Sequence, residues 1–313
     1  MLKQNRKVLQ VGQLSPDGAR DLAREFNVTV LPDNAGERAA LLKREGAEFT
    51  AIASNGHAPV DDALLAQLPN VERIASPSAG IEGIDLAAAA ARGITVTNSS
   101  AVLADECADV ALSLILALTR RTVAADRYVR EGKWPGGPFP LGRTLKGLKV
   151  GIYGLGHIGK AIARRLDVSG AVVSYHGRTQ QAGVSYPYYS SLVDLAAAND
   201  MLVVAAPGGV QTARTVDAAV IAAIGEEGWL VNISRGSIVD EDALAAALAA
   251  DRIAGFASDV FATEPHVRQE FIDDPRTVLL PHYGSGTVQT RRAMVDTMLT
   301  SLRQHFAVAE AAE

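Results

Sequence analysis

The chain has 313 residues, of which 48% are hydrophobic and 21% charged, a composition typical of a globular enzyme with room for two domains. Its formal net charge of −5 argues against a nucleic-acid-binding surface, which would need a basic stripe. No apolar stretch has signal-peptide or membrane-spanning length, and with Cys107 as the only cysteine no intrachain disulfide can form. We therefore expect a cytoplasmic protein that binds neither nucleic acids nor membranes.

Residues 1–100 alternate short β-rich runs with helical patterns. Ser15 followed by Pro16 is a typical helix start, an N-cap residue before a proline in the first turn. Strands are expected at 8–11, 28–31, 49–53, 71–75 and 94–97, with helices after Pro16 and at 36–45, 61–68 and 84–92. This alternation predicts a parallel sheet covered by helices on both faces, and hence a complete α/β domain.

Residues 105–130 carry the pattern of one long helix. Its middle, 110–118, is apolar on more than one face, which predicts burial either between domains or against a second subunit. A homodimer is therefore expected. Three prolines and two glycines at 133–140 predict a loop after this helix, and the crossing between the domains is placed near residue 101.

Residues 147–179 predict a βαβ unit with a glycine-rich first turn. A short apolar strand is followed by Gly-x-Gly-x-x-Gly at 154–159, then by an apolar helical stripe and a second strand at 171–175. Glycines at this spacing permit a tight bend, close approach of the backbone to a pyrophosphate, and close packing of helix on strand. The anion would bind at the free N–H groups of the helix start. A dinucleotide-binding site is therefore predicted here.

The end of the second strand indicates which dinucleotide is bound. NAD sites usually place an acidic residue about 20 residues after the glycines, where it binds the ribose 2′-hydroxyl. Residues 174–179 contain no acidic side chain and offer the Arg178 guanidinium and the Thr179 hydroxyl, which suit a 2′-phosphate. NADP(H) is favoured over NAD(H); the alternative interpretation is that Arg178 is an ordinary solvated cation.

The same alternation continues to the end of the chain. Strands are expected at 201–206, 229–233, 255–259 and 278–280, and helices at 216–224, from Asp240 and after Gly286. The last helix has the length to return to the first domain. Ligands of such sheets bind beyond the carboxyl ends of the strands. Arg235, Glu264 and His282 follow three of these strands, so we predict an anion clamp, a base partner and a titrating acid at one edge.

Four segments together resemble the D-isomer-specific 2-hydroxyacid dehydrogenases, and especially their glyoxylate/hydroxypyruvate reductase branch. They are residues 150–159, 232–244, 258–265 and 280–287, and the resemblance covers nearly the whole chain. It implies an α/β fold of two doubly wound parallel-sheet domains with the active site in the cleft between them. Residues 1–100 with 287–313 would form a discontinuous substrate-binding domain, and residues 101–286 a Rossmann NAD(P)-binding domain.

The resemblance also implies the chemistry. A hydride would pass between nicotinamide C4 and the keto carbon of a 2-oxo acid, while His282 donates a proton to the carbonyl oxygen. Glu264 would hold His282 and favour its protonated form. Arg235 would bind the carboxylate and carbonyl oxygens in a fork. The implied ligands are NADP(H), or alternatively NAD(H), and a small 2-oxo or 2-hydroxy acid, with no metal.

The residues around each ligand follow from the same resemblance. Those around the cofactor would be Gly154, Leu155, Gly156, His157, Ile158, Gly159, Gly177, Arg178, Thr179, Ala206, Pro207, Thr212, Ile233, Ser234, Arg235, Asp259, His282 and Gly284. Asp259 would contact the nicotinamide carboxamide. Those around the substrate would be Ser54, Ser78, Ala79, Gly80, Arg235 and His282, with the 78–80 loop offering backbone N–H groups to its carboxylate.

The expected activity is NADPH-dependent reduction of glyoxylate or hydroxypyruvate. The alternatives are a D-2-hydroxyacid dehydrogenase of the phenylpyruvate, aryl-pyruvate or phosphoglycerate type, and a dinucleotide-sensing binding protein of the same fold. Ala79 and Tyr283 depart from the family pattern, which leaves the shape of the substrate pocket open. Trp134 occupies a position from which some relatives reach into the neighbouring subunit; the alternative is a loop tryptophan that only covers apolar surface.

Overall fold

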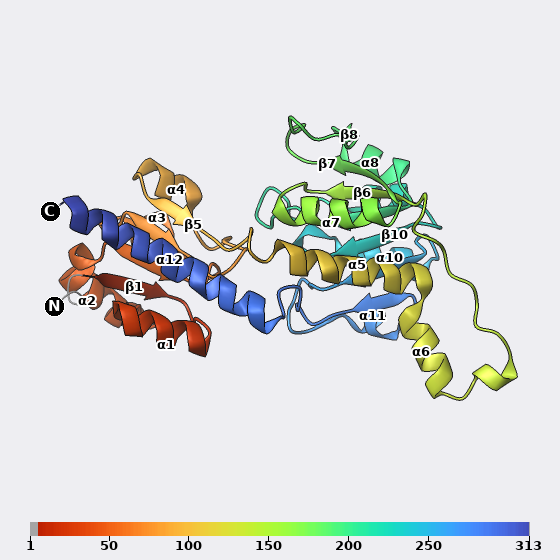
Figure 1. Ribbon diagram of the computed structural model, residues 1–313, viewed down its shortest axis with the longest axis horizontal. Helices are drawn as coiled ribbons and strands as arrows, with labels where there is room; N and C mark the ends of the chain where they lie inside the picture. The colour runs from red at the N-terminus through yellow and green to blue at the C-terminus, as the bar shows by residue number, and fades with distance from the viewer. Residues whose placement is uncertain (1–5, 313) are drawn as a thin grey trace. The chain divides into compact units, whose positions relative to one another are not determined.

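The computed structural model describes residues 6–312. The chain forms two compact units, the first comprising Met1–Leu103 and Thr287–Glu313 and the second Ala104–Gly286. The colours of Figure 1 follow this division: the red and orange elements share one unit with the blue final helix, and the green elements belong to the other. The chain therefore passes out of the first unit after Leu103 and returns to it after Gly286.

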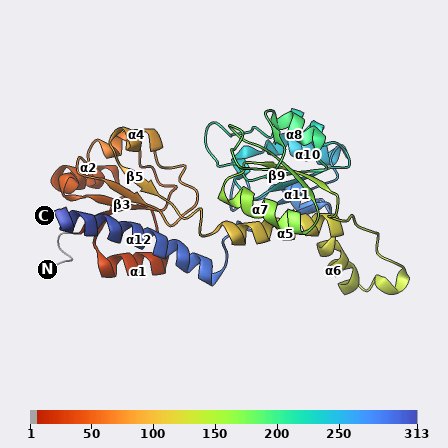
Figure 2. The ribbon, with the colours of Figure 1, turned by 45° about the horizontal axis from the view of Figure 1, so that its top comes forward.

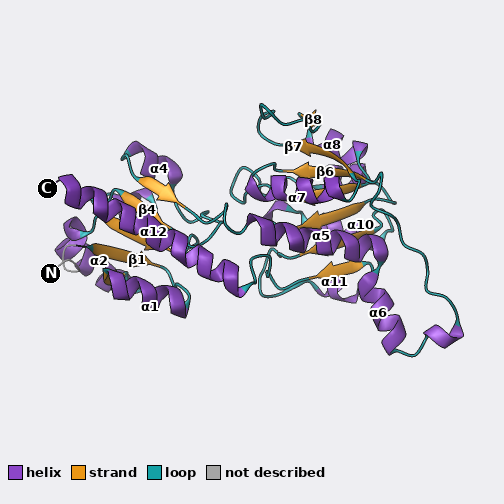
Figure 3. Cartoon of the chain, viewed as in Figure 1, coloured by secondary structure: helices purple, strands orange, loops and turns teal. Residues whose placement is uncertain are grey.

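The first unit is a five-stranded parallel sheet in the order β2-β1-β3-β4-β5, and Figure 3 draws its strands in orange. Its strands are β1 (Lys7–Val11), β2 (Asn27–Val30), β3 (Ala51–Ser54), β4 (Arg73–Ala75) and β5 (Thr95–Thr97). Its helices are α1 (Pro16–Glu25), α2 (Ala35–Glu45), α3 (Asp62–Leu65), α4 (Leu86–Ala91) and α12 (Val288–Ala312), with a 3-10 turn at Gly46–Glu48.

Helices cover both faces of this first sheet because successive side chains of a strand point to opposite sides. Val8 of β1 belongs to a core with Leu22 of α1 and Met298 of α12, whereas the next residue, Leu9, packs with Leu42 of α2. Figures 1 and 2 both show α12 lying along the sheet. The last helix of the chain thus completes the core of its first unit.

The second unit is a seven-stranded parallel sheet in the order β12-β11-β10-β9-β6-β7-β8. Its strands are β6 (Lys149–Tyr153), β7 (Val172–His176), β8 (Tyr188–Tyr189), β9 (Met201–Val204), β10 (Trp229–Asn232), β11 (Gly255–Ser258) and β12 (Thr277–Leu279). Its helices are α5 (Ala104–Arg120), α6 (Thr122–Arg130), α7 (His157–Val168), α8 (Leu192–Ala198), α9 (Ala218–Ile224), α10 (Glu241–Ala249) and α11 (Gln269–Asp273), with 3-10 turns at Trp134–Gly136 and Gly236–Ile238. The strand order reverses at β6, the point at which such sheets bind their ligands.

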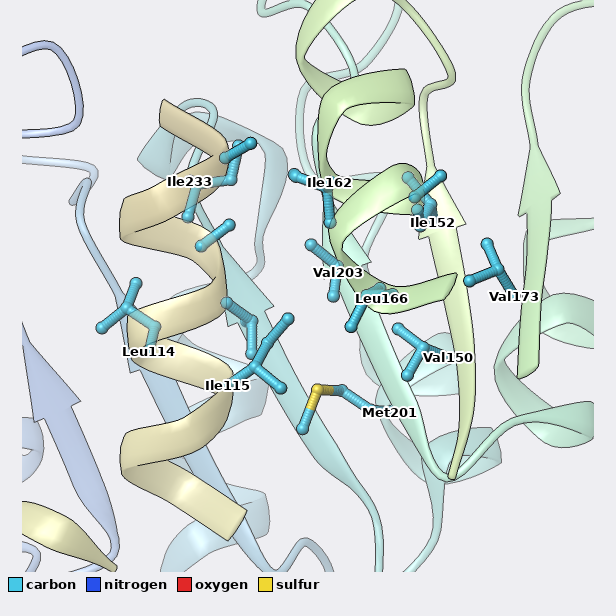
Figure 4. Close-up of a cluster of buried hydrophobic side chains, with 14 of the residues drawn as sticks. Leu114, Ile115, Val150, Ile152, Ile162, Leu166, Val173, Met201, Val203 and Ile233 are labelled. Atoms are coloured by element: carbon cyan, nitrogen blue, oxygen red, sulfur yellow. The ribbon is translucent and has the colours of Figure 1, made fainter. Parts of the chain in front are cut away.

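Two hydrophobic cores hold the second sheet. On one face, Leu114 and Ile115 of α5 and Ile162 of α7 pack over Val150 and Val203 of the sheet (Figure 4). On the other face, a separate core joins α8, α9 and α10 to the strands. The expectation of two parallel-sheet α/β units is confirmed.

The prediction of one long helix at 105–130 is wrong. The helix ends at Arg120, Arg121 adopts a left-handed conformation with φ of 56°, and α6 begins at Thr122. A single left-handed residue breaks the helical hydrogen-bond ladder and turns the chain. The burial of α5 also has a different cause from the one expected, because its apolar side chains cover the sheet of their own unit.

Some strand limits also differ from the expectation, and three short elements were not expected. Phe49 is completely buried but precedes β3, so its apolar character reflects the core and not the strand. The expected strand at 201–206 ends at Val204, where the chain turns into a loop. The elements not expected are β8, α8 and α11.

None of the helices within residues 6–312 is long and apolar enough to cross a bilayer.

Candidate active site

The turn between β6 and α7 uses its three glycines in different ways. Gly154 has φ of +97°, and a side chain there would overlap the backbone of Ala206. A Cβ on Gly159 would overlap the carbonyl oxygen of Gly154. Among the described residues, nothing lies within 4 Å of the Cβ position at Gly156, the N-cap of α7, and no side chain makes a capping hydrogen bond to this helix. Two glycines therefore serve the fold, while the third leaves the helix start open to an anion such as a pyrophosphate.

The loop after β7 carries the residues expected at the adenosine end of the cofactor. Arg178 and Thr179 are exposed, and Gly177 is half-buried. Arg178 makes no hydrogen bond or ion pair within the described residues 6–312, so its guanidinium is available to a ligand. Of the other residues expected around the cofactor, His157 is exposed, Ile158 is half-buried, and Leu155 and Ile233 are buried.

The loops after β9 and β10 are joined by hydrogen bonds. The Ser234 hydroxyl donates to the carbonyl oxygen of Ala206, and the Ser234 N–H donates to Oδ1 of Asn232 at 3.1 Å. Pro207 is exposed, and its carbonyl oxygen accepts from the Thr212 hydroxyl at 2.7 Å. These residues form one continuous edge beside the glycine turn, since Ala206 also lies against Gly154.

Asp259, directly after β11, holds the loop that carries His282. The Asp259 side chain is 2% exposed, and its two carboxylate oxygens accept the N–H groups of Tyr283 and Gly284, each at 2.7 Å. Burial raises the pKa of Asp259, although these two N–H groups oppose the rise. His282 itself has φ of 51°, an unfavourable conformation that needs such support. The structure gives Asp259 the role of a loop anchor, and its contact with the nicotinamide carboxamide stays a prediction.

Glu264 and His282 form a direct pair. Oε2 of Glu264 lies 2.7 Å from Nδ1 of His282, and Oε1 accepts the N–H of Phe261 at 2.9 Å. The carboxylate is thereby held at both oxygens, and the two side chains remain 34% and 44% exposed. Because Nδ1 faces a carboxylate oxygen, Nε2 is the ring atom left to contact a ligand.

Arg235 follows β10 and is half-buried. Its Nη1 donates to the carbonyl oxygen of Ser234 at 2.7 Å, and the Asn232 side chain donates to the carbonyl oxygen of Arg235 at 2.9 Å. These contacts hold the backbone and one edge of the guanidinium. The Arg235 loop and the Glu264–His282 pair thus follow neighbouring strands, β10, β11 and β12, at one end of the sheet.

Two supporting residues were not predicted from the sequence. A Cβ on Gly236 would overlap the backbone of Phe261 and Ala262, so the Arg235 loop touches the loop that carries Glu264. Glu241 accepts the N–H of Ala262 at 2.9 Å. Its place directly after the N-cap of α10 was visible in the sequence, but the loop that it contacts was not.

Of the residues expected to bind the substrate, Ser54, Ser78, Ala79 and Gly80 lie in the first unit at the carboxyl ends of β3 and β4, and Arg235 and His282 lie in the second unit. The N–H of Ser78 donates to a neighbouring serine hydroxyl, while those of Ala79 and Gly80 find no acceptor within residues 6–312. Ser54 is completely buried, and its hydroxyl accepts the N–H of Gly56 at 3.0 Å. Ser54 therefore supports the turn from inside, and its contact with the substrate stays a prediction.

A glycine turn at the reversal point of a parallel sheet, an open helix start and a carboxylate–imidazole pair at the same edge define a nicotinamide-dinucleotide oxidoreductase. Residues 112–284 match the model of a known family, described as the NAD binding domain of D-isomer specific 2-hydroxyacid dehydrogenases. The chain belongs to the D-isomer-specific 2-hydroxyacid dehydrogenase family. The resemblance noted in the sequence is thereby confirmed.

Similar proteins cover almost the whole chain. A glyoxylate/hydroxypyruvate reductase A from Arabidopsis thaliana is 44% identical over 96% of this chain and 95% of its own length. A hydroxyphenylpyruvate reductase from Plectranthus scutellarioides is 41% identical, with 85% of each chain covered. Among solved structures, an NADPH-dependent glyoxylate/hydroxypyruvate reductase from Sinorhizobium meliloti, in complex with NADP and malonate, is 40% identical, covers 93% of this chain and 90% of that one, and has a TM-score of 0.81.

Proposed function

We propose that the protein uses NADPH to reduce small 2-oxo acids, glyoxylate and hydroxypyruvate, to 2-hydroxy acids. The observation that carries this proposal is the Glu264–His282 pair, with 2.7 Å between Oε2 and Nδ1, on the same sheet edge as the open glycine turn. The names of the Arabidopsis and Sinorhizobium proteins support the choice of substrates. A bound nicotinamide supplies the hydride.

In the proposed mechanism each polar residue has one task. Nε2 of His282 gives its proton to the substrate oxygen, while Glu264 fixes the ring through Nδ1 and stabilises the imidazolium. Arg235 binds the carboxylate and the carbonyl oxygen and stabilises the negative charge that develops on that oxygen. We also assign the N–H groups of Ala79 and Gly80, in the first unit, to a substrate carboxylate.

The central experiment measures initial rates with His282→Ala. The kcat for glyoxylate should fall by about 10²–10⁴, the range for loss of a general acid, while the Kd of NADPH stays within about twofold. His266→Ala is the matched control, because His266 is an exposed histidine two residues beyond Glu264. Unchanged turnover by the His282 variant would remove the proposed acid. NADPH binding by the wild type without turnover of any 2-oxo acid would instead indicate a dinucleotide sensor.

A second candidate substrate is hydroxyphenylpyruvate, which the name of the Plectranthus relative favours. The measurement that separates the candidates is a panel of kcat/KM values for glyoxylate, hydroxypyruvate, pyruvate, phenylpyruvate and hydroxyphenylpyruvate. We expect the two small acids to have the highest values. A higher value for either aromatic acid would replace the proposed substrate class with an aryl-pyruvate.

The NADPH preference is assigned to Arg178. Its guanidinium would bind the 2′-phosphate, and bidentate pairs of this kind are strong. We expect Arg178→Ala to lower the ratio of kcat/KM for NADPH to that for NADH by about 10–100-fold, which corresponds to about 1.4–2.8 kcal/mol. A ratio equal to that of the wild type would contradict the assignment.

We also propose a cytoplasmic homodimer. The support for a dimer is the apolar surface of α6 and the following loop, where Val129, Trp134 and Leu141 are 54%, 66% and 95% exposed. Light scattering should give a mass twice that of the 32.8 kDa chain, and Leu141→Asp should lower it. A monomer at micromolar concentration would exclude the dimer.

A fluorescent fusion concentrated in an organelle would contradict the cytoplasmic location.

A further inference from the structure

The loop between β7 and β8, residues 177–187, is tied down at several points on both sides of Arg178. The Tyr188 hydroxyl donates to the carbonyl oxygen of Gly177 at 3.1 Å. The Tyr186 hydroxyl donates to the carboxylate of Asp167 at the end of α7. Burial, together with that carboxylate, raises the pKa of Tyr186 to about 12, so the phenol keeps its proton and remains a donor at neutral pH.

Gln181 makes the contact that reaches the glycine turn. Its side-chain Nε2 donates to the carbonyl oxygen of Leu155 at 2.8 Å, and its backbone N–H donates to the Tyr175 hydroxyl at 2.8 Å. Tyr175 lies in β7 and is 1% exposed, so this acceptor is fixed by the core. Gln181 therefore connects the loop that carries Arg178 to a residue inside the turn that would bind the pyrophosphate.

Arg178 itself has no partner within residues 6–312, so only its backbone places it. A mobile loop would have to be ordered each time a 2′-phosphate is bound, and this ordering costs conformational entropy. A loop that is already held removes most of that cost from the binding step. NADH has no 2′-phosphate and gains little from the position of Arg178.

We propose that Gln181 is a positioning residue for NADPH selectivity, because it fixes the Arg178 segment at a set distance from the glycine turn. This inference rests on the proposed function, in which Arg178 binds the 2′-phosphate. Gln181 acts through the loop and needs no contact with the cofactor. Its removal should weaken binding of ligands that carry a 2′-phosphate and spare those that lack it.

The test compares Gln181→Met with Gln180→Met. Methionine has nearly the length of glutamine but cannot donate to the carbonyl oxygen of Leu155, and Gln180 is an exposed neighbour that makes no side-chain hydrogen bond within residues 6–312. Calorimetry gives the Kd values of NADPH, NADH, 2′,5′-ADP and 5′-AMP. For Gln181→Met we expect Kd to rise about fivefold, the equivalent of about 1 kcal/mol, for NADPH and 2′,5′-ADP. For NADH and 5′-AMP, the Kd of this variant should change by less than about twofold. For Gln180→Met, the Kd of each of the four ligands should change by less than about twofold.

Tyr175→Phe provides an independent second variant, since it removes the other partner of Gln181 without altering the loop sequence. It should weaken 2′,5′-ADP binding in the same direction. The inference is overturned if Gln181→Met weakens NADPH and NADH equally, or leaves both unchanged while Arg178→Ala lowers the NADPH preference. In the latter case the proposed function stands. If Arg178→Ala leaves the preference unchanged, both the cofactor assignment and this inference are wrong.

Discussion

At the scale of single residues, the glycines of the dinucleotide turn can be separated by experiment. Gly156→Ala should change the free energy of unfolding by less than about 1 kcal/mol, because its Cβ would meet no atom within 4 Å. Gly159→Ala should cost about 1–3 kcal/mol through overlap with the carbonyl oxygen of Gly154. NADPH affinity should fall in both. Urea unfolding measures the free energy of unfolding, and calorimetric titration measures NADPH affinity. Equal losses of stability in the two variants would contradict the different roles assigned to Gly156 and Gly159.

Asp259 permits a second prediction at this scale. Asn in its place presents an NH₂ group to one of the two backbone N–H groups that the carboxylate now accepts, so one hydrogen bond is lost. The loss should lower the free energy of unfolding by about 1–3 kcal/mol and kcat by at least about tenfold, as His282 leaves its position. Asp251→Asn is the control, because that carboxylate is exposed. Wild-type kcat in Asp259→Asn would show that the loop does not depend on this anchor.

At the scale of elements, the packing of α12 on β4 predicts a pH dependence of stability. His305 of α12 is 7% exposed, and its Nε2 is buried without a hydrogen-bond partner among the described residues. Burial lowers the pKa of His305; Glu72, with a carboxylate oxygen 3.9 Å from Nδ1, opposes this, and Arg73 adds to it. The unfolded chain therefore takes up the proton first as the pH falls.

The direction in which pH changes the stability follows from the lowered pKa of His305. The stability contributed by neutral His305 is complete above the unfolded-state value of about 6.5 and is lost as the pH falls through the folded-state value below it. Between pH 7.5 and 5.5 the unfolding temperature of the wild type should therefore drop more than that of His305→Gln. His57→Gln, at a largely exposed histidine of the same unit, should behave as the wild type. Parallel curves for the two glutamine variants would contradict the prediction.

The elements also show how far the sequence alone could go. Periodic patterns predicted both parallel sheets, and the glycine spacing predicted the turn after β6, since each depends on residues close together in the chain. The break at Arg121 was missed because no glycine or proline marks the left-handed turn. The positions of Glu264 and His282 after neighbouring strands predicted that they share one edge of the sheet, and the resemblance implied their direct contact. The roles of Gln181 and Gly236 depend on loops without periodicity, so no local pattern indicated them.

At the scale of the whole molecule, each unit has hydrophobic cores of its own. A ligand that binds only the folded state stabilises it by RT ln(1 + [L]/Kd), about 2.7 kcal/mol at a concentration of 100 Kd. Because the glycine turn lies in the second unit, NADPH should slow amide hydrogen exchange in β6, α7 and β9 more than in β1 and β2. Mass spectrometry of proteolytic peptides measures this, and equal slowing in all five elements would contradict it.

The return of the chain after Gly286 has a consequence for biosynthesis. During translation, residues 104–286 leave the ribosome before α12 does, so the nucleotide-binding half has its complete sequence while the amino-terminal half still lacks the helix that covers one face of its sheet. Val8, Ala53 and Ala75 then remain without their Met298 and Leu302 neighbours. The part of the protein synthesised first is therefore the last to complete its core, and a nascent chain stalled near its end carries a sheet face only partly covered, by α1, which chaperones can bind.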